Sequence, residues 1–110
     1  MKTKLVALFL WMLCLSASAE WVRGDPDCAM WVKPDTHARE LENKAWLIGF
    51  LSGANMTLTL TLDADHKPFN YLGGITTGQI YLWMDNYCRA NPLSSAMYGV
   101  GEFMLERNNK

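Results

Sequence analysis

The sequence predicts a small all-α protein, a bundle of three to four helices with an irregular N-terminal arm that one disulfide ties to the bundle. Three observations support this fold class. Apolar residues recur at helical spacing in three separate segments. Prolines, glycines and helix-capping residues separate those segments. Two cysteines, Cys28 and Cys88, form an even pair once an export signal at the start of the chain is set aside.

Residues 1–19 have the pattern of a secretory signal peptide. Lys2 and Lys4 precede an apolar run from residue 5 to residue 15, and small residues occupy positions 16–19. The apolar run has 11 residues, whereas a helix that crosses a bilayer needs roughly 20. We therefore predict cleavage before Glu20 rather than a retained anchor. The mature chain, residues 20–110, is then a single helical domain without a stable membrane span, located in the periplasm or secreted.

The charge of the mature chain limits its partners. Cleavage removes two lysines, so 8 Lys and Arg face 11 Asp and Glu, and the formal charge changes from -1 to -3. Binding to nucleic acid or to an anionic membrane surface depends on clustered Lys and Arg. The mature sequence has no such cluster, and we predict no nucleic-acid partner.

Cys28 and Cys88 are predicted to form a disulfide, because Cys14 lies in the signal segment and leaves with it. An even pair in an oxidising compartment favours pairing. The alternatives are two free thiols or a metal site, although two cysteines without a histidine cluster cannot supply the four ligands of a structural zinc site. Closing a loop of about 60 residues would stabilise the fold by about 4 kcal/mol.

The elements follow from capping residues and helical periodicity. Residues 20–34 contain Gly24, Pro26 and Pro34, which exclude a long helix, so we predict an irregular arm. A first helix is predicted from about Thr36 to near Leu60, with Asp35 or Thr36 as its N-cap. Its apolar face is expected to comprise Leu41, Ala45, Ile48, Leu51 and Met56, widened by Trp46, Leu47 and Phe50.

Two features of this first helix need an explanation. Ala45, Gly49 and Gly53 form a ridge of small residues, and each glycine costs about 1 kcal/mol relative to alanine. We expect the ridge to let another helix of the domain approach closely, with a partner-docking groove as the alternative. Residues 57–62 alternate threonine and leucine, which is typical of a strand. A single short strand would lack a pairing partner, so we favour a helix that frays there.

The remaining chain predicts a loop and two further helices. Residues 63–74 are rich in turn formers. A second helix is expected from Thr76 or Thr77 to near Asn91, where Pro92 ends it, with Ile80, Trp83, Met84, Tyr87 and Cys88 on one side. A third is expected from Ser94 or Ser95 to about Arg107, with Met97, Val100, Phe103 and Met104 as its core face. The short link between them favours antiparallel packing.

No residues combine into a convincing catalytic, metal or cofactor site. His66 follows Asp63 and Asp65, which suggests a metal or acid–base cluster, but the spacing is not that of a calcium loop and such aspartates are usually solvated turn formers. His37 lies at a predicted helix start without a nucleophile beside it. A small hydrolase that uses His66 with Asp63 or Asp65 is therefore the last of three functional hypotheses, and we predict no catalytic residue, metal or cofactor.

The aromatic residues are the other candidates. Trp46 and Trp83 are predicted to be in the core, because their neighbours have helical periodicity. Trp21, Trp31 and Tyr71 are the candidate partner surface, with burial in the core as the alternative.

Three stretches carry a family resemblance: CAMWV at 28–32, WLIGFLSGAN at 46–55 and LWMDNYCRANPL at 82–93. Together they resemble a group of small exported bacterial proteins, which is similar to Rap/Tai-type immunity proteins and, more loosely, to HdeA-type periplasmic acid-stress chaperones. The first resemblance implies a helical dimer that blocks a toxic effector enzyme. The second implies a chaperone with one disulfide that unfolds in acid, although the stretch at 82–93 is not a hallmark of that family.

These inferences lead to one expected function and one alternative. We expect an exported, non-enzymatic binding protein with a protein partner, similar to an immunity protein that inhibits a toxic effector, and able to form a homodimer. The alternative is an acid-stress chaperone. The excess of carboxylates would leave a positive, self-repelling chain once they are protonated, and the methionines would supply an adaptable contact surface.

Overall fold

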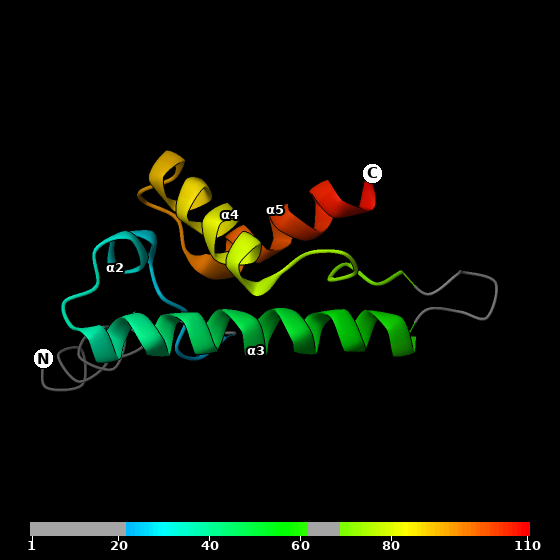
Figure 1. Cartoon of the computed structure of the whole chain (residues 1–110), viewed down its shortest axis with the longest axis horizontal. Coiled ribbons are helices and arrows are strands. Elements are labelled where there is room, and N and C mark those ends of the chain that lie inside the picture. The colour runs from blue at the N-terminus through cyan, green and yellow to red at the C-terminus, as the bar shows by residue number, and fades with distance from the viewer. Residues whose placement is uncertain (1–21, 62–68) are drawn as a thin grey trace, which may run out of the picture.

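The computed structural model describes residues 22–61 and 69–110, which form four helices. These are α2 (Cys28–Val32), α3 (His37–Thr61), α4 (Thr77–Ala90) and α5 (Ala96–Asn108). Figure 1 shows α3 along the length of the molecule, with α4 and α5 on one side of it and α2 near its N-terminal end. The all-α fold class is confirmed. The predicted signal segment, residues 1–19, lies outside the described residues.

The long helix α3 begins and ends close to the predicted positions. The hydroxyl of Thr36 accepts a hydrogen bond from the backbone N–H of Arg39, so Thr36 rather than Asp35 caps it. The alternating segment is helical as far as Thr61. The Thr59 and Thr61 hydroxyls donate to backbone carbonyls four residues earlier, which satisfies these side chains within a helix. Position 62, the end of that predicted stretch, lies outside the described residues.

Local signals also place α4. The Thr76 side chain accepts from the backbone N–H of Gln79, and the Gln79 side chain accepts from the backbone N–H of Thr76. This reciprocal pair is a capping box. The helix ends at Ala90, immediately before Asn91 and Pro92, as predicted.

The start of α5 is stabilised from a distance. Ser95 is the N-cap by position, but its hydroxyl makes no capping hydrogen bond and is buried without a partner among the described residues. Instead, the carboxylate of Asp25 accepts from the backbone N–H of Met97 at 2.8 Å. The N-terminal arm therefore supplies the acceptor that the first turn of α5 needs.

The arm is more ordered than predicted, because it contains the short helix α2. The carboxylate of Asp27 accepts from the backbone N–H of Met30 and caps α2. The arm also pairs with the α4–α5 link through two backbone hydrogen bonds, from the Cys28 N–H to the Ser94 carbonyl and from the Ala96 N–H to the Pro26 carbonyl, both at 3.0 Å. These bonds fix the arm across the start of α5.

Cys28 and Cys88 form the predicted disulfide, which joins α2 to α4 at a Cα–Cα distance of 4.7 Å. Both are 1% exposed and belong to the core. That core lies where α2, α3, α4 and α5 meet, and the other buried apolar residues are Trp31, Leu47, Leu51, Ile80, Met84, Ala96, Val100 and Phe103. The predicted core faces are thus confirmed at Ile80, Met84 and Cys88 of α4 and at Val100 and Phe103 of α5.

The predicted core face of α3 is confirmed in its middle part, where Leu47 and Leu51 are buried and Trp46, Ile48 and Phe50 pack against the core, and is wrong at Leu41, Ala45 and Met56. Leu41 and Met56 are 54% and 64% exposed, whereas Leu47 is fully buried. The buried stripe of α3 is Asn43, Leu47 and Leu51, because the polar Asn43 donates to the backbone carbonyl of Met30 at 3.1 Å and so binds α3 to α2. Trp46 and Trp83, predicted to be core residues, are half-buried against this core.

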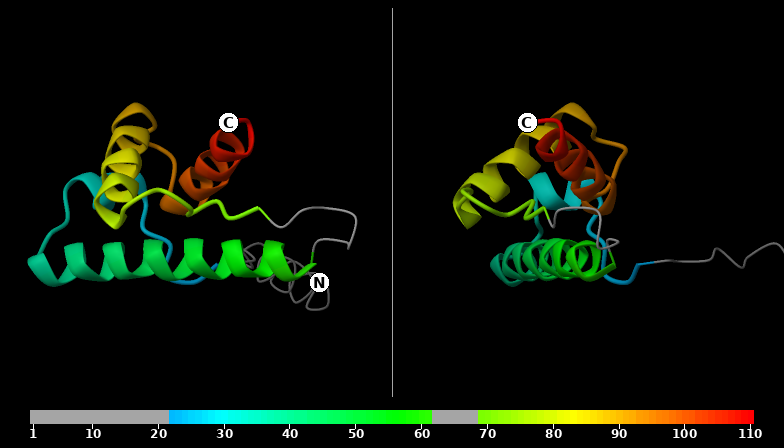
Figure 2. Two further views of the ribbon diagram at one scale, coloured as in Figure 1. Left: turned by 45° about the vertical axis from the view of Figure 1, so that its right-hand side comes forward. Right: turned by 90° about the vertical axis from the view of Figure 1, so that its right-hand side faces the viewer.

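Within residues 22–61 and 69–110, the small-residue ridge is not used for internal packing. Outside the backbone of α3 itself, no described atom lies within 4 Å of a Cβ built at Gly49 or Gly53, and Ala45 is exposed as well. The ridge is offset by two residues from Leu47 and Leu51, which places it about 200° around the helix from the core. Close helix approach occurs instead at Gly99 of α5, where a Cβ would lie 2.7 Å from Met84 Sδ. Figure 2 confirms that α4 and α5 lie on the same side of α3.

Candidate functional site

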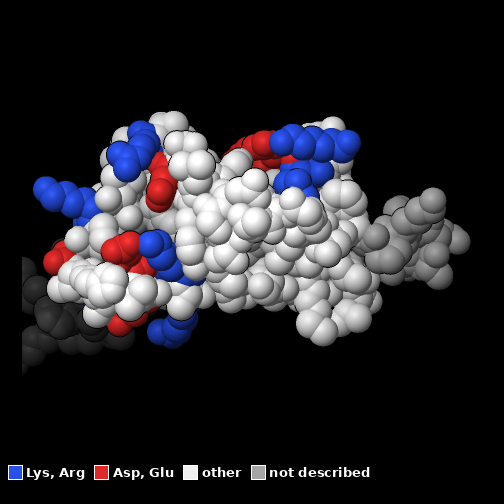
Figure 3. Space-filling model, in the orientation of Figure 1, with Lys and Arg blue, Asp and Glu red and all other residues white. Residues whose placement is uncertain are grey.

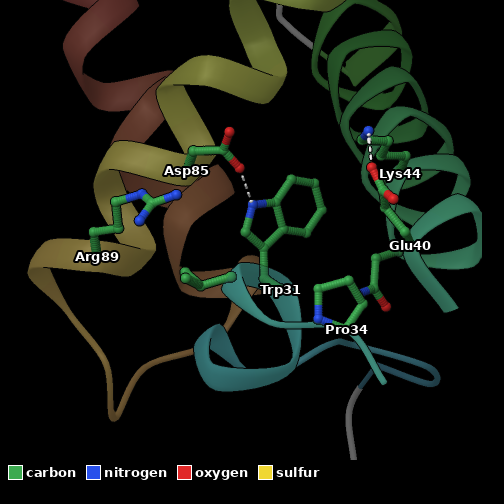
Figure 4. Close-up of a pocket in the computed structure, with 8 residues that line it drawn as sticks. Trp31, Pro34, Glu40, Lys44, Asp85 and Arg89 are labelled. Carbon is green, nitrogen blue, oxygen red and sulfur yellow. Dashed lines mark hydrogen bonds and ion pairs between the residues drawn. The ribbon is translucent and has the colours of Figure 1, made fainter. Parts of the chain in front are cut away.

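Helices α2, α3 and α4 enclose a cleft of about 280 Å³ near the N-terminal end of α3. We call it the polar cleft, because most of its lining side chains are charged or form hydrogen bonds. Figure 4 shows α3 on one side, α4 on the other and Trp31 of α2 between them. Its labelled lining residues are Trp31, Pro34, Glu40, Lys44, Asp85 and Arg89.

Trp31 lies between the two walls of the polar cleft, and its side chain belongs to the core. Its side chain is 6% exposed, and its indole Nε1–H donates to the carboxylate of Asp85 at 2.7 Å. A carboxylate acceptor makes this hydrogen bond stronger than one between neutral groups. Because the disulfide joins the same two helices, α2 and α4 are held by a covalent link and a charge-assisted hydrogen bond.

The α3 wall carries an ion pair. Lys44 Nζ lies 2.5 Å from Glu40 Oε1 and 5.4 Å from the centroid of the Tyr81 ring. The hydrogen bond from Lys44 holds the pKa of Glu40 below its ordinary value of 4.5, and the same bond raises the pKa of Lys44. His37 lies 3.5 Å from Glu40 and lowers its pKa further. Both partners of the ion pair stay charged across the neutral range.

The α4 wall carries Asp85 and, one turn later, Arg89. One oxygen of Asp85 accepts from Trp31, and no described donor reaches the other. Arg89 is exposed, and its guanidinium has no acceptor among residues 22–61 and 69–110. Figure 4 shows the guanidinium on the α4 side of the polar cleft, pointing toward Trp31. The cleft therefore has five guanidinium N–H donors available for a ligand.

The candidate partner residues do not come together. Trp21 lies outside the described residues, and Trp31 lies at the base of the polar cleft. Tyr71 is half-buried; its N–H donates to Asn55 and its carbonyl accepts from Arg107. In Figure 1 the segment 69–74 lies toward the C-terminal end of α3, whereas α2 lies toward the opposite end.

The residues of the hydrolase hypothesis fall in a part of the chain that the structure does not describe. Asp63, Asp65 and His66 lie at positions 62–68, outside the described residues. His37 is exposed at the start of α3 and contacts Glu40. Within the described ranges, no group of three or more His, Cys, Asp and Glu side chains could hold a metal ion. In the same ranges no helix combines the length and apolar character that a membrane crossing requires.

The outer face of α3 is the second surface that stands out, and it contains the small-residue ridge. Positions 45–61 include no charged residue. A shallow groove of about 600 Å³ follows this face and is lined by Gly49, Phe50, Gly53, Ala54, Thr57 and Leu58. Met56 and Leu60, on the same helix, are 64% and 72% exposed. In Figure 3 the charged side chains gather toward the N-terminal end of α3 and near the end of α5, and the region over the C-terminal half of α3 is uncharged.

Sequence reasoning did not identify the polar cleft, although a signal was present. Glu40 and Lys44 are four residues apart, as are Asp85 and Arg89, and such acid–base spacing is typical of exposed helix faces. The sequence does not reveal that the two helices bring these pairs to the same cleft.

Comparisons with protein-family models, with curated proteins and with solved structures found no match to this chain.

Proposed function

We propose that this chain is an exported, non-enzymatic binding protein that recognises a protein partner outside the cytoplasm through the outer face of α3. The observation that carries the proposal is the uncharged, exposed helix face from Ala45 to Thr61, with its groove over Gly49 and Gly53. Exposed apolar area of this kind favours association, at roughly 25 cal/mol for each Å² that a partner covers.

The chemistry of this face defines its occupant. A charged group placed against it would lose its hydration without gaining a counter-ion, so the partner must present an uncharged, largely apolar surface. The missing side chains at Gly49 and Gly53 allow a partner helix to approach the α3 backbone closely. We propose a helix with an apolar face, supplied by another protein, as the occupant.

Two consequences of the disulfide support an exported inhibitor similar to an immunity protein. The Cys28–Cys88 disulfide is consistent with an oxidising compartment. It also ties the arm, α2 and α4 into one unit, so the face is presented by a preorganised scaffold that loses little conformational entropy on binding. Such a scaffold suits the neutralisation of a toxic effector.

The test compares two arginine variants in envelope extracts. Gly53→Arg places a charge in the groove, whereas Gly101→Arg places the same charge at an exposed glycine of α5 with open space around it. We expect wild type and Gly101→Arg to capture one defined protein in stoichiometric amount, and Gly53→Arg to lose it. The captured protein, produced alone, should be toxic to the cell, and only wild type and Gly101→Arg should relieve the toxicity.

Three results would overturn the proposal. The first is equal capture by both arginine variants. The second is a captured protein whose toxicity neither variant affects. The third is an isolated wild-type dimer that Gly53→Arg converts into a monomer, which would assign the face to a second copy of this chain.

One observation favours an acid-stress chaperone as a second candidate. Carboxylates accept three hydrogen bonds between elements: Asp85 from Trp31, Glu106 from the indole of Trp83 and Asp25 from the Met97 N–H. The Trp83 hydrogen bond lowers the pKa of Glu106, so protonation of Glu106 in acid would weaken this contact between α4 and α5 and expose apolar surface. Suppression of client aggregation at about pH 3, below the ordinary carboxylate pKa, would support this candidate, and unaltered aggregation would exclude it.

A further inference from the structure

A second, mostly apolar hollow of about 610 Å³ lies between α2 and α4, next to the polar cleft. We call it the disulfide hollow, because Cys28 and Cys88 line it. Its apolar lining also includes Ala29, Met30, Val32 and Pro92. Val32 and Arg89 line both the hollow and the polar cleft. The two spaces therefore adjoin, and Arg89 lies where they meet.

The charged groups at this hollow favour an anion. Lys33 and Arg89 line it, and neither side chain has an acceptor among residues 22–61 and 69–110. The one lining carboxylate, Asp27, already accepts the Met30 N–H that caps α2. Two unpaired cations beside apolar surface are suited to a ligand that carries a carboxylate next to an apolar group.

We propose that the disulfide hollow binds the carboxyl-terminal residue of a polypeptide that ends in an apolar side chain. Arg89 receives the terminal carboxylate as a two-pronged hydrogen-bond donor, and Lys33 adds a second positive charge. The apolar side chain rests on Val32, Pro92 and the disulfide, where its burial excludes water and strengthens the ion pair.

The adjoining polar cleft makes a peptide the better fit than a fatty acid. A peptide has backbone N–H groups before its last residue, and these need acceptors once they leave water. On the cleft side of Arg89, the second oxygen of Asp85 has no described donor, so it can accept from such an N–H. A fatty acid would instead place an alkyl chain against these charged groups. The proposal is independent of the outer face of α3, since the two surfaces share no lining residue.

The test is a titration of the ¹⁵N-labelled mature protein, followed by the amide signals of Met30 and Val32 and the indole signal of Trp31. N-acetyl-alanyl-leucine is the probe, and its carboxamide is the matched ligand without the charge. We expect saturable shifts with the acid and roughly tenfold weaker binding of the amide, because a charge-assisted hydrogen bond is lost. Hexanoate, which has a carboxylate and an alkyl chain but no backbone N–H, tests whether the hollow binds a fatty acid instead.

Charge-matched variants complete the design. Arg89→Gln should weaken binding of the acid about tenfold, to the level of the amide, and Lys33→Gln should weaken it by a smaller factor. Arg23→Gln removes one positive charge from an exposed residue that does not line the hollow, and should bind like wild type. Any one of five results would overturn the proposal. For the ligands, these are equal binding of acid and amide, tighter binding of hexanoate than of the acid, or no saturation. For the variants, these are no effect of Arg89→Gln, or a loss in Arg23→Gln equal to that in Arg89→Gln.

Discussion

Alanine at Gly99 should destabilise the protein, although alanine is the better helix former. A methyl carbon at this position would lie 2.7 Å from Met84 Sδ and 2.8 Å from both Met84 Cε and Tyr87 Cδ1. Met84 is 1% exposed, so its side chain can make room for the methyl only by shifting within the core. The Tyr87 ring stacks on Trp83 at 5.5 Å, and its hydroxyl bonds to Ser94 at 2.8 Å, so the ring is held as well.

The size of the effect follows from two opposing contributions. Forcing an extra methyl into a packed core costs about 1 to 3 kcal/mol, and replacing glycine by alanine within a helix returns about 1 kcal/mol. We therefore expect Gly99→Ala to lower the free energy of unfolding by about 1 kcal/mol. Gly101→Ala, in the same helix and with nothing within 4 Å of its Cβ, should raise that free energy by up to about 1 kcal/mol.

Urea unfolding of the oxidised variants, followed by far-ultraviolet circular dichroism, measures both changes. Thermal unfolding should show midpoints on opposite sides of wild type, because 1 kcal/mol corresponds to about 4 to 8 °C in a domain of this size. If Gly99→Ala were as stable as Gly101→Ala, the close contact between α4 and α5 would not exist and the packing described here would be wrong.

Three further predictions concern the disulfide, the small-residue ridge and the effect of pH. Replacing both Cys28 and Cys88 by alanine should lower the unfolding free energy by about 4 kcal/mol in urea; a loss under about 1 kcal/mol would contradict the entropic estimate. Gly53→Ala should stabilise the isolated protein by up to about 1 kcal/mol in the same assay, whereas a loss would mean that the ridge is packed internally. The hydrogen bond from Trp83 holds the pKa of Glu106 below its ordinary value of 4.5. As the pH falls, the unfolded state therefore takes up this proton before the folded state does. The stability that this hydrogen bond contributes is present above pH 4.5 and is lost as the pH falls below it. Glu106→Gln should therefore reduce the decline of the urea midpoint between pH 5 and about pH 3, and an unchanged decline would exclude Glu106 as its source.

Local signals explain which elements could be predicted from the sequence. The capping box of Thr76 and Gln79, and the proline after Asn91, act within four residues of the helix ends that they define, so both ends of α4 were predicted. The disulfide was predictable because only one pairing of the mature cysteines exists. In each case the deciding interaction involves neighbours in the chain or has no competitor.

Long-range contacts explain what could not be predicted. The first turn of α5 is capped by Asp25, which precedes Met97 by 72 residues, and no local pattern indicates that pairing. The orientation of α3 depends on Asn43, a polar residue that is buried because the Met30 carbonyl accepts its hydrogen bond. Periodicity of apolar residues therefore located Leu47 and Leu51 in the core but wrongly added Leu41 and Met56, because this helix is apolar over most of its circumference.

The same reasoning applies to the polar cleft. Asp85 and Arg89 have the spacing of an ordinary exposed pair, and the packing of α2 against α4 makes both of them lining residues of the polar cleft. The bond between Asp85 and Trp31, two residues separated by 54 positions, joins the base of the cleft to its α4 wall and holds Trp31 in the core. The sequence left two roles open for Trp31, a partner contact or a core residue, and the structure places its side chain in the core.

Site-specific photo-crosslinking in living cells tests the proposed binding face most directly. A photoreactive residue at Met56, 64% exposed on α3, is compared with one at Leu105, 60% exposed on α5. Our account predicts one discrete adduct with another protein from position 56 and none from position 105. Equal adducts from both positions, an adduct of twice the mass of the chain, or no adduct from position 56 would contradict it.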